Sequence, residues 1–242
     1  AIGFRIPLFI ASGLAALCVL AIILVIRESK IRDQGITHRP SRWAVIGQAA
    51  THKVIGRMML LTFLIGFAFT GIESQFGLWS QARFGWEPRD IAVCFAFTGA
   101  TAFLTQTFIT ARMSEKFGEG VMLAIGMAMT ALAAAGQVFS VGGPMTIALM
   151  CLTAIGQSVS FPNVGAIISR TADPHQQGQI LGLNNAMGAL ARVVGPVCAG
   201  LIVPLARDGP FILGAMMAAP AILLALSAVR HAPPRVAPEP KP

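Results

Sequence analysis

The sequence predicts an all-α, polytopic membrane protein, and three observations lead to this prediction. Seven apolar stretches each reach about 20 residues, the length that a helix needs to cross the hydrocarbon layer. Of the 242 residues, 55% are hydrophobic and 12% are charged, and the mean hydropathy is +0.71. This composition argues against the alternative, a soluble helical bundle. The stretches also lack the alternation of barrel strands, and unpaired backbone groups are costly in lipid.

The predicted helices follow one another along nearly the whole chain. They cover Ile6 to Ile26, Met58 to Trp79, Ile91 to Ala111, Val121 to Val141, Met145 to Ile168, Ile180 to Leu205 and Phe211 to Val229. The longest connection, Glu28 to Arg57, is basic and has little apolar periodicity, so we place a domain boundary there. The sequence therefore predicts units at residues 1–29 and 58–231, a loop at 30–57 and a disordered Pro-rich tail at 232–242.

The basic residues predict the orientation of the helices. Most lie in connections on one side of the predicted membrane, and the positive-inside rule makes that side cytoplasmic, together with the C-terminus. Only four lie on the other side: Arg5, Arg83, Arg89 and Arg207. If the protein is bacterial, this places it in the plasma (inner) membrane. The net charge of +8 is thus distributed by side, which gives no reason to expect nucleic-acid binding.

Polar residues are expensive in lipid, so their spacing indicates which helices face protein or water. The second, third, fifth and sixth stretches each carry a polar or small-residue stripe at helical spacing. The first, fourth and seventh are almost wholly apolar and are expected to face lipid. After the long loop, an order of polar, polar, apolar therefore occurs twice, as in secondary transporters built from three-helix repeats. Small residues can also serve helix packing alone, which remains the alternative for any single stripe.

Three segments resemble motifs of the major facilitator superfamily. "ARMSEKFGEG", residues 111–120, resembles the second copy of the family's cytoplasmic gate loop, with Glu115, Lys116 and Gly118 matching its acid, base and glycine. Glu119 stands where that motif ends on a basic residue, which weakens the inferred gate role. "GLNNAMGALARVVGPVCAG", residues 182–200, resembles the repeat counterpart of the antiporter glycine-proline motif through Gly182, Gly195, Pro196 and Gly200. The third is "GFRIPLFIASGLAAL" followed by "RES", which resembles the family's sixth helix.

The resemblance covers nearly the whole chain and is nearest to the tetracycline-efflux-like drug:proton antiporters. It implies a major-facilitator-type bundle: the last helix of an N-terminal half, the central cytoplasmic loop and the six-helix C-terminal half. It also implies secondary active transport by alternating access, with proton-coupled export of a small amphipathic compound or drug. Its partners would be this substrate, protons, the lipid bilayer and the missing N-terminal half of the same protein. Uptake or exchange of a metabolite, or a non-transporting membrane scaffold or receptor, remains the alternative.

Two charged side chains, Glu73 and Arg192, lie well inside the predicted helices. A carboxyl in a dry cavity favours its protonated form, so Glu73 can load and unload a proton and is the proton-coupling candidate. A non-titrating carboxyl that accepts hydrogen bonds is the alternative. Arg192 stays charged and needs an acidic partner, helix carbonyls or water, so it is expected either to pair with Glu73 or to fix an interface between the halves.

The candidates for lining a substrate cavity lie on the polar stripes. Gln157 and Asn163 are favoured because neighbouring Pro162 frees a backbone carbonyl inside its helix. Packing against lipid or other helices is the alternative for the aromatic member, Phe76. No enzyme motif, cofactor site or metal site is recognised. The full set of cavity candidates is Thr70, Phe76, Thr98, Thr101, Gln157, Asn163 and Asn184.

Overall fold

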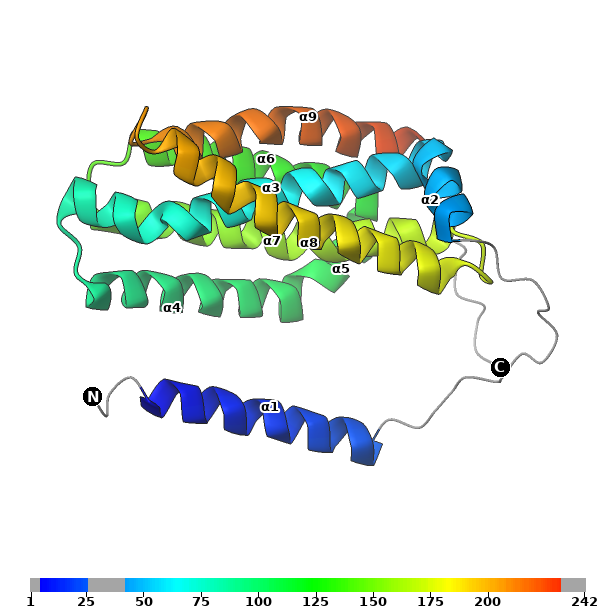
Figure 1. The fold of residues 1–242 in the computed structure, drawn as a ribbon, viewed down its shortest axis with the longest axis horizontal. Coiled ribbons are helices and arrows are strands. Elements are labelled where there is room, and N and C mark those ends of the chain that lie inside the picture. Colours follow the sequence, from blue (N-terminus) through cyan, green and yellow to red (C-terminus); the bar gives the residue numbers. More distant parts are fainter. Residues whose placement is uncertain (1–4, 26–41, 232–242) are drawn as a thin grey trace. The chain divides into compact units, whose positions relative to one another are not determined.

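The computed structural model describes residues 5–25 and 42–231, and every regular element in these ranges is a helix (Figure 1). Seven spans in them are long and apolar enough to cross a membrane, so the predicted all-α membrane fold is confirmed. Each predicted stretch falls within a few residues of an observed span. The helices are α1 (Arg5–Val25), α2 (Arg42–Thr51), α3 (Lys53–Phe84), α4 (Pro88–Leu104), the π-helix η1 (Thr105–Thr110), α5 (Ala111–Phe117), α6 (Glu119–Val138), α7 (Gly143–Thr171), α8 (Gln177–Ile202) and α9 (Gly209–His231).

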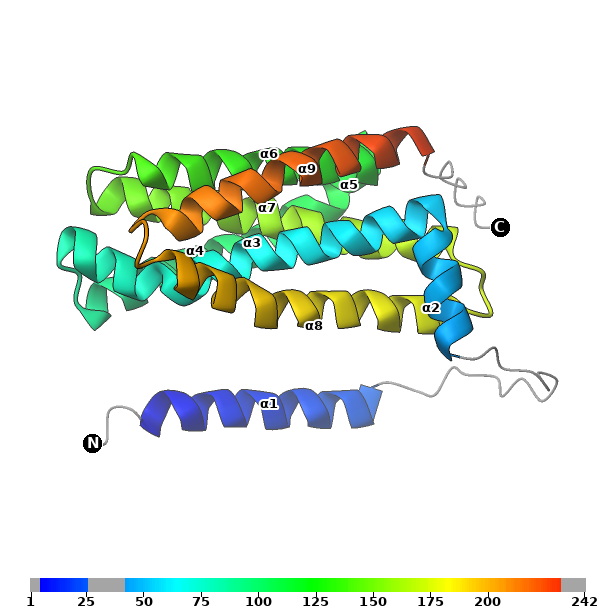
Figure 2. The ribbon, with the colours of Figure 1, turned by 45° about the horizontal axis from the view of Figure 1, so that its top comes forward.

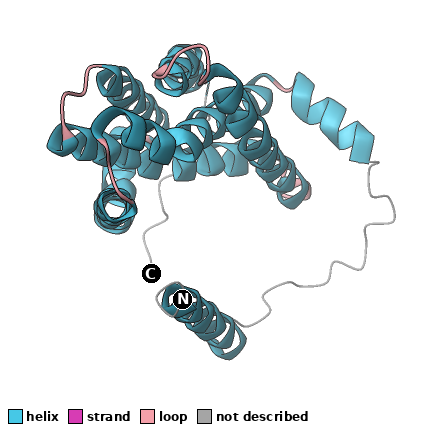
Figure 3. Cartoon of the chain, turned by 60° about the vertical axis from the view of Figure 1, so that its left-hand side comes forward, coloured by secondary structure: helices cyan, strands magenta, loops and turns pink. Residues whose placement is uncertain are grey.

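The chain divides into two units, Ala1–Pro40 and Ser41–Pro242. The first contains α1, which has no charged residue after Arg5 and whose side chains are exposed from Leu8 to Val25. The second contains all the other helices (Figure 3). We call the end of this second unit at which α3 begins the proximal end, and the end at which α3 finishes the distal end.

The predicted loop Glu28 to Arg57 is partly helical, because it contains α2 and the first residues of α3. His52 separates these two helices, and its imidazole Nδ1 accepts a hydrogen bond of 3.4 Å from the backbone N–H of Ile55, which caps α3. Ala49 of α2 is buried in the same apolar cluster as Ile55. The helix was missed because its segment shows little apolar periodicity: residues 46–48 are exposed and Ala49 is buried. Residues 26–41 and the predicted tail, 232–242, lie outside the described residues.

Helix α3 lies in the middle of the second unit (Figures 1 and 2). Helices α8 and α9 pack against α3, α9 also packs against α6, and α7 packs against both α6 and α4. Two apolar clusters fill the interior: one includes Leu61, Ile65 and Val164, and the other, nearer the distal end, includes Ile72, Phe76 and Met150. Between them, at the middle of α7, the interior is polar.

Candidate functional site

Small residues bring α3 and α8 into close contact along a shared seam. A Cβ atom on Gly66 would lie 2.9 Å from the Cβ of Ala191, and one on Gly195 would lie 2.7 Å from the carbonyl oxygen of Phe67. A side chain at either position would therefore collide with the facing helix. Gly195, which was selected as part of the antiporter-like motif, is required by this contact. Gly182 and Gly200 are not comparably crowded.

Two cavity candidates make hydrogen bonds in this seam. The hydroxyl of Thr62 donates to Oδ1 of Asn184 at 2.7 Å, and Asn184 is buried. The hydroxyl of Thr70 lies 2.8 Å from the carbonyl oxygen of Gly66 and 3.4 Å from that of Ala191. Thr62 pairs with Asn184 and the later Thr70 pairs with the later Ala191, so α3 and α8 run parallel. Thr70 and Asn184 thus join the two helices that carry Glu73 and Arg192.

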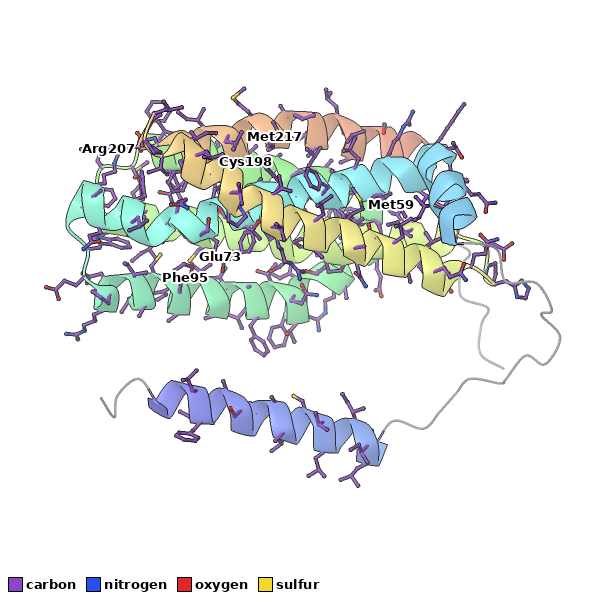
Figure 4. All side chains as sticks on the ribbon, in the orientation of Figure 1. Met59, Glu73, Phe95, Cys198, Arg207 and Met217 are labelled. Carbon is purple, nitrogen blue, oxygen red and sulfur yellow. The ribbon has the colours of Figure 1, made fainter. Side chains whose placement is uncertain are left out.

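Glu73 and Arg192 are both exposed on the second unit. In Figure 4, Glu73 projects from the side of α3 that faces α4 in that view, away from α9. The close approach of Gly66 to Ala191 places Arg192 near the level of Phe67, about 9 Å along the helix axis from Glu73. Within residues 42–231 the two charges form no ion pair with each other. Pro196 lacks an N–H, so it leaves the carbonyl of Arg192, four residues earlier, without its usual helical donor.

Helices α4 and α7 are joined where both depart from regular α-helical geometry. Pro162 cannot donate to the carbonyl of Ser158. The hydroxyl of Thr110, the last residue of η1, lies 3.2 Å from that carbonyl oxygen and 3.1 Å from the carbonyl oxygen of Thr105, so its single proton is shared between the two acceptors. The hydroxyl of Ser158 in turn donates to the carbonyl of Ala102 at 3.3 Å. The carbonyl that Pro162 was expected to free is therefore used to bind the neighbouring helix.

Gln157 lies beside this joint, midway along α7 between Met150 of one apolar cluster and Val164 of the other. Its side chain is 6% exposed, and in the part of the chain that the structure describes neither its amide nitrogen nor its amide oxygen has a hydrogen-bond partner. An unpaired buried amide is costly, and a polar group of a ligand that reached it would relieve that cost. Asn163, by contrast, donates to the carbonyl of Val159 at 2.6 Å.

The other cavity candidates differ in exposure. The ring of Phe76 is fully buried and contacts Trp79, Trp86 and Phe95, with centroids 5.6 to 6.0 Å apart. This burial favours the packing alternative for Phe76. Thr98 is half-buried and donates to the carbonyl of Cys94 at 2.8 Å, and Thr101 is half-buried on the same helix. Both threonines border an exposed helix face, since α4 has only Cys94 buried.

The candidate gate loop lies at the proximal end. Gly118 separates α5 from α6 with a φ of +85°, a left-handed conformation that favours glycine. Glu115 and Lys116 are exposed, and Lys116 lies 5.3 Å from the ring of Phe117. Glu119, the departure from the family motif, forms an ion pair with Arg170 at the end of α7. This pair joins α6 to α7, and it could not be predicted from the sequence because the two residues are far apart in the chain.

A second network that sequence reasoning missed lies at the distal end. Arg83 donates to Oδ1 of Asp208 at 2.9 Å and to the carbonyls of Val138 and Ser140 at 3.0 Å. The indole N–H of Trp79 donates to the same oxygen of Asp208 at 2.7 Å. These contacts join the end of α3 to the end of α6 and the start of α9. Among residues 5–25 and 42–231 no group of three or more potential metal ligands comes together.

The sequence matches the Major Facilitator Superfamily over residues 76–242. The chain belongs to this superfamily. It is 25% identical over 214 residues to multidrug resistance protein 2 of Bacillus subtilis (strain 168), covering 87% of the chain and 53% of the relative. It is 28% identical over 144 residues to the class C tetracycline resistance protein of Escherichia coli, covering 60% and 36%.

A solved superfamily structure has the same fold. The human organic anion transporter MFSD10 (TETRAN) matches with a TM-score of 0.68 at 21% identity, over 76% of this chain and 46% of that one. The chain spans about half the length of the curated relatives it matches, 53% and 57% for the two multidrug resistance proteins. Superfamily membership makes it a multi-pass integral membrane protein and confirms the family resemblance found in the motifs.

Proposed function

We propose that this chain forms part of a secondary transporter that exports small amphipathic organic compounds in exchange for protons, by alternating access. In this proposal α1 is the last helix of an N-terminal half, and α3 to α9 form the C-terminal half. The similarity to proteins named for multidrug and tetracycline resistance supports the export of such compounds. The matched share of those relatives leaves room for a preceding half.

The exposure of Glu73 is the observation that carries the proposal. A carboxylate in the middle of an apolar span is expensive unless it meets water or a partner, and nothing in residues 42–231 covers it. If the opposite half covers this face, the cavity between the halves can open to one side of the membrane and then to the other. Glu73 would then contact water in the open states and be shielded from water when the cavity is closed. Glu73 would bind a proton in one state and release it in the other.

Arg192 would act from the adjacent helix. Its guanidinium is exposed and stays charged, so it needs an acidic partner or water inside the membrane. It lies about 9 Å along the axis from Glu73, so a shift of α8 against α3 would change the distance between the two charges. Arg192 would then hold Glu73 ionised in one state, or pair with a carboxylate of the other half.

The substrate would contact the half-buried threonines Thr98 and Thr101 on α4 and the unpaired amide of Gln157 on α7. Thr70, Asn163 and Asn184 already bond within the bundle, so in this proposal they shape the helices that line the cavity. The gate loop Glu115, Lys116 and Gly118 would position α5 against the other half on the cytoplasmic side.

The decisive experiment uses the transporter with both halves in proteoliposomes. An imposed pH gradient drives transport of ethidium or tetracycline, and the proton flux coupled to each compound is recorded. Glu73→Gln is expected to abolish the pH-driven component, because glutamine cannot exchange a proton, while the amount of folded protein stays the same. Arg192→Lys tests whether the forked guanidinium is needed.

Glu87→Gln is the matched control, because Glu87 is an exposed carboxylate just outside the span and should have no effect. Unchanged pH-driven transport in Glu73→Gln would overturn the proton-coupling role. Substrate movement in the opposite direction would instead support metabolite uptake or exchange. If neither substitution nor any pH gradient changes transport, the scaffold or receptor alternative gains support.

A further inference from the structure

A cavity of about 740 Å³ lies at the distal end, apart from Glu73 and Gln157. It is formed where the close seam between α3 and α8 ends: Gln75 of α3 still contacts the position of Gly200, and α8 finishes at Ile202. Its volume falls in the range of sites for small organic ligands. The lining residues are Gln75, Leu78, Trp79, Gln81, Ala82, Arg83, Val203, Pro204, Arg207 and Asp208.

One wall of the cavity is held rigidly. Asp208 accepts hydrogen bonds from both Trp79 and Arg83, and Arg83 is also held by two backbone carbonyls at the end of α6. Trp79 packs against Phe211 at a centroid distance of 4.6 Å. The cavity is therefore bounded by side chains that are already committed to contacts with one another, so a ligand would meet a preformed surface.

The charges of the cavity do not balance. The negative charge of Asp208 is matched by its ion pair with Arg83. Arg207, labelled at this end in Figure 4, is exposed, and no acidic side chain in the described ranges forms an ion pair with it. One uncompensated guanidinium thus borders a cavity whose other walls include Leu78, Val203 and Pro204.

We propose that this cavity binds an amphipathic organic anion, with its carboxylate or sulfonate on Arg207 and its apolar body against Leu78, Val203 and Pro204. Guanidinium binds such groups through paired, charge-assisted hydrogen bonds. A cation would meet the net positive charge of the site, and a fully apolar molecule would leave Arg207 unused. The site is separate from the proton-coupling face and does not depend on the role of Glu73.

The test compares two probes with the same body, 4-methylbenzenesulfonate and its uncharged amide, 4-methylbenzenesulfonamide. Their Kd values are measured by titration calorimetry with the two-half transporter in nanodiscs. The sulfonate is expected to bind more tightly than the sulfonamide, and Arg207→Gln is expected to weaken sulfonate binding about tenfold or more, as for loss of a charge-assisted hydrogen bond. The same substitution should leave sulfonamide binding unchanged, and Ala82→Trp, which fills the cavity, should abolish both.

Arg89→Gln is the matched control, because it removes one positive charge from the start of α4, at the same end of the bundle but outside the cavity. It should not change the Kd for the sulfonate. The proposal is overturned if wild-type protein does not bind the sulfonate, if Arg207→Gln or Ala82→Trp binds it as wild type does, or if Arg89→Gln weakens binding equally. Binding that persists in Glu73→Gln separates this site from the proposed proton coupling.

Discussion

Helix α7 contacts α6 and α4 in two different ways. Its contact with α6 is a close approach of the two backbones at glycines. A Cβ on Gly126 would lie 2.7 Å from the carbonyl oxygen of Gly156 and would also collide with the hydroxyl of Ser160. Against α4 and η1 it uses hydroxyl groups, Ser158 and Thr110, that bond to backbone carbonyls across the interface. One contact depends on the absence of side chains and the other on directional bonds.

The two interfaces differ in how easily one helix can move against the other. Backbones in close contact gain dispersion energy only at one separation, so α6 and α7 should move together. Hydrogen bonds between membrane helices are individually weak, about 0.6 kcal/mol on average, and a hydroxyl can exchange one carbonyl for another. The α4 to α7 joint, with its π-helix and its proline, is therefore the interface at which one helix can shift against the other.

The largest loss of stability should come from adding side chains at the glycine contact between α6 and α7. Gly126→Ala together with Gly156→Ala is expected to destabilise the folded protein by about 2 kcal/mol or more, because both Cβ atoms meet backbone oxygen atoms that cannot move aside. Thermal denaturation in detergent, followed by size-exclusion chromatography, measures the loss. Gly165→Ala, on the same helix with nothing within 4 Å of its Cβ, should leave the Tm unchanged. Equal Tm values for the two variants would show that the contact is not rigid.

A smaller change in stability, of opposite sign, is expected for a substitution at Gln157, which lies beside the contact between α4 and α7. Gln157→Leu removes two unpaired buried polar atoms and should raise stability by about 1 kcal/mol or more, while lowering transport if the amide contacts substrate. The same thermal assay measures the Tm, and the proteoliposome assay measures transport. A lower Tm would mean that a bound water or ligand already satisfies the amide.

The smallest effect should come from the directional bonds themselves. Thr110→Val removes the donor to the carbonyl of Ser158 and should cost about 0.6 kcal/mol. In a Pro162→Ala background the N–H of residue 162 can bond to that carbonyl, so the same substitution should cost less there. A double-mutant cycle of unfolding free energies measures the difference. Additive effects of the two substitutions would contradict the assignment of the Pro162-freed carbonyl to Thr110.

Particular residues show how far helical spacing could predict the site. Spacing placed Thr70 and Asn184 on interior faces, and in the structure both form hydrogen bonds within the bundle. Spacing could not distinguish Phe76, which is enclosed by other rings, from residues that border an exposed face. Burial depends on which helix lies opposite, and one sequence does not specify that neighbour. Whether Glu73 and Arg192 couple to protons or to substrate stays a prediction.

The helices could be predicted from the sequence alone, because their lengths and composition follow from the thickness and polarity of the bilayer and from each helix satisfying its own backbone hydrogen bonds. The sequence also indicated the superfamily through short motifs in residues 111–120 and 182–200. The partners of the polar groups, in contrast, are known from the folded structure: Ser158 with Thr110, Glu119 with Arg170, and Asp208 with Arg83 and Trp79. These contacts join residues far apart in the chain, so they arise from the packing of helices against one another and from no local pattern.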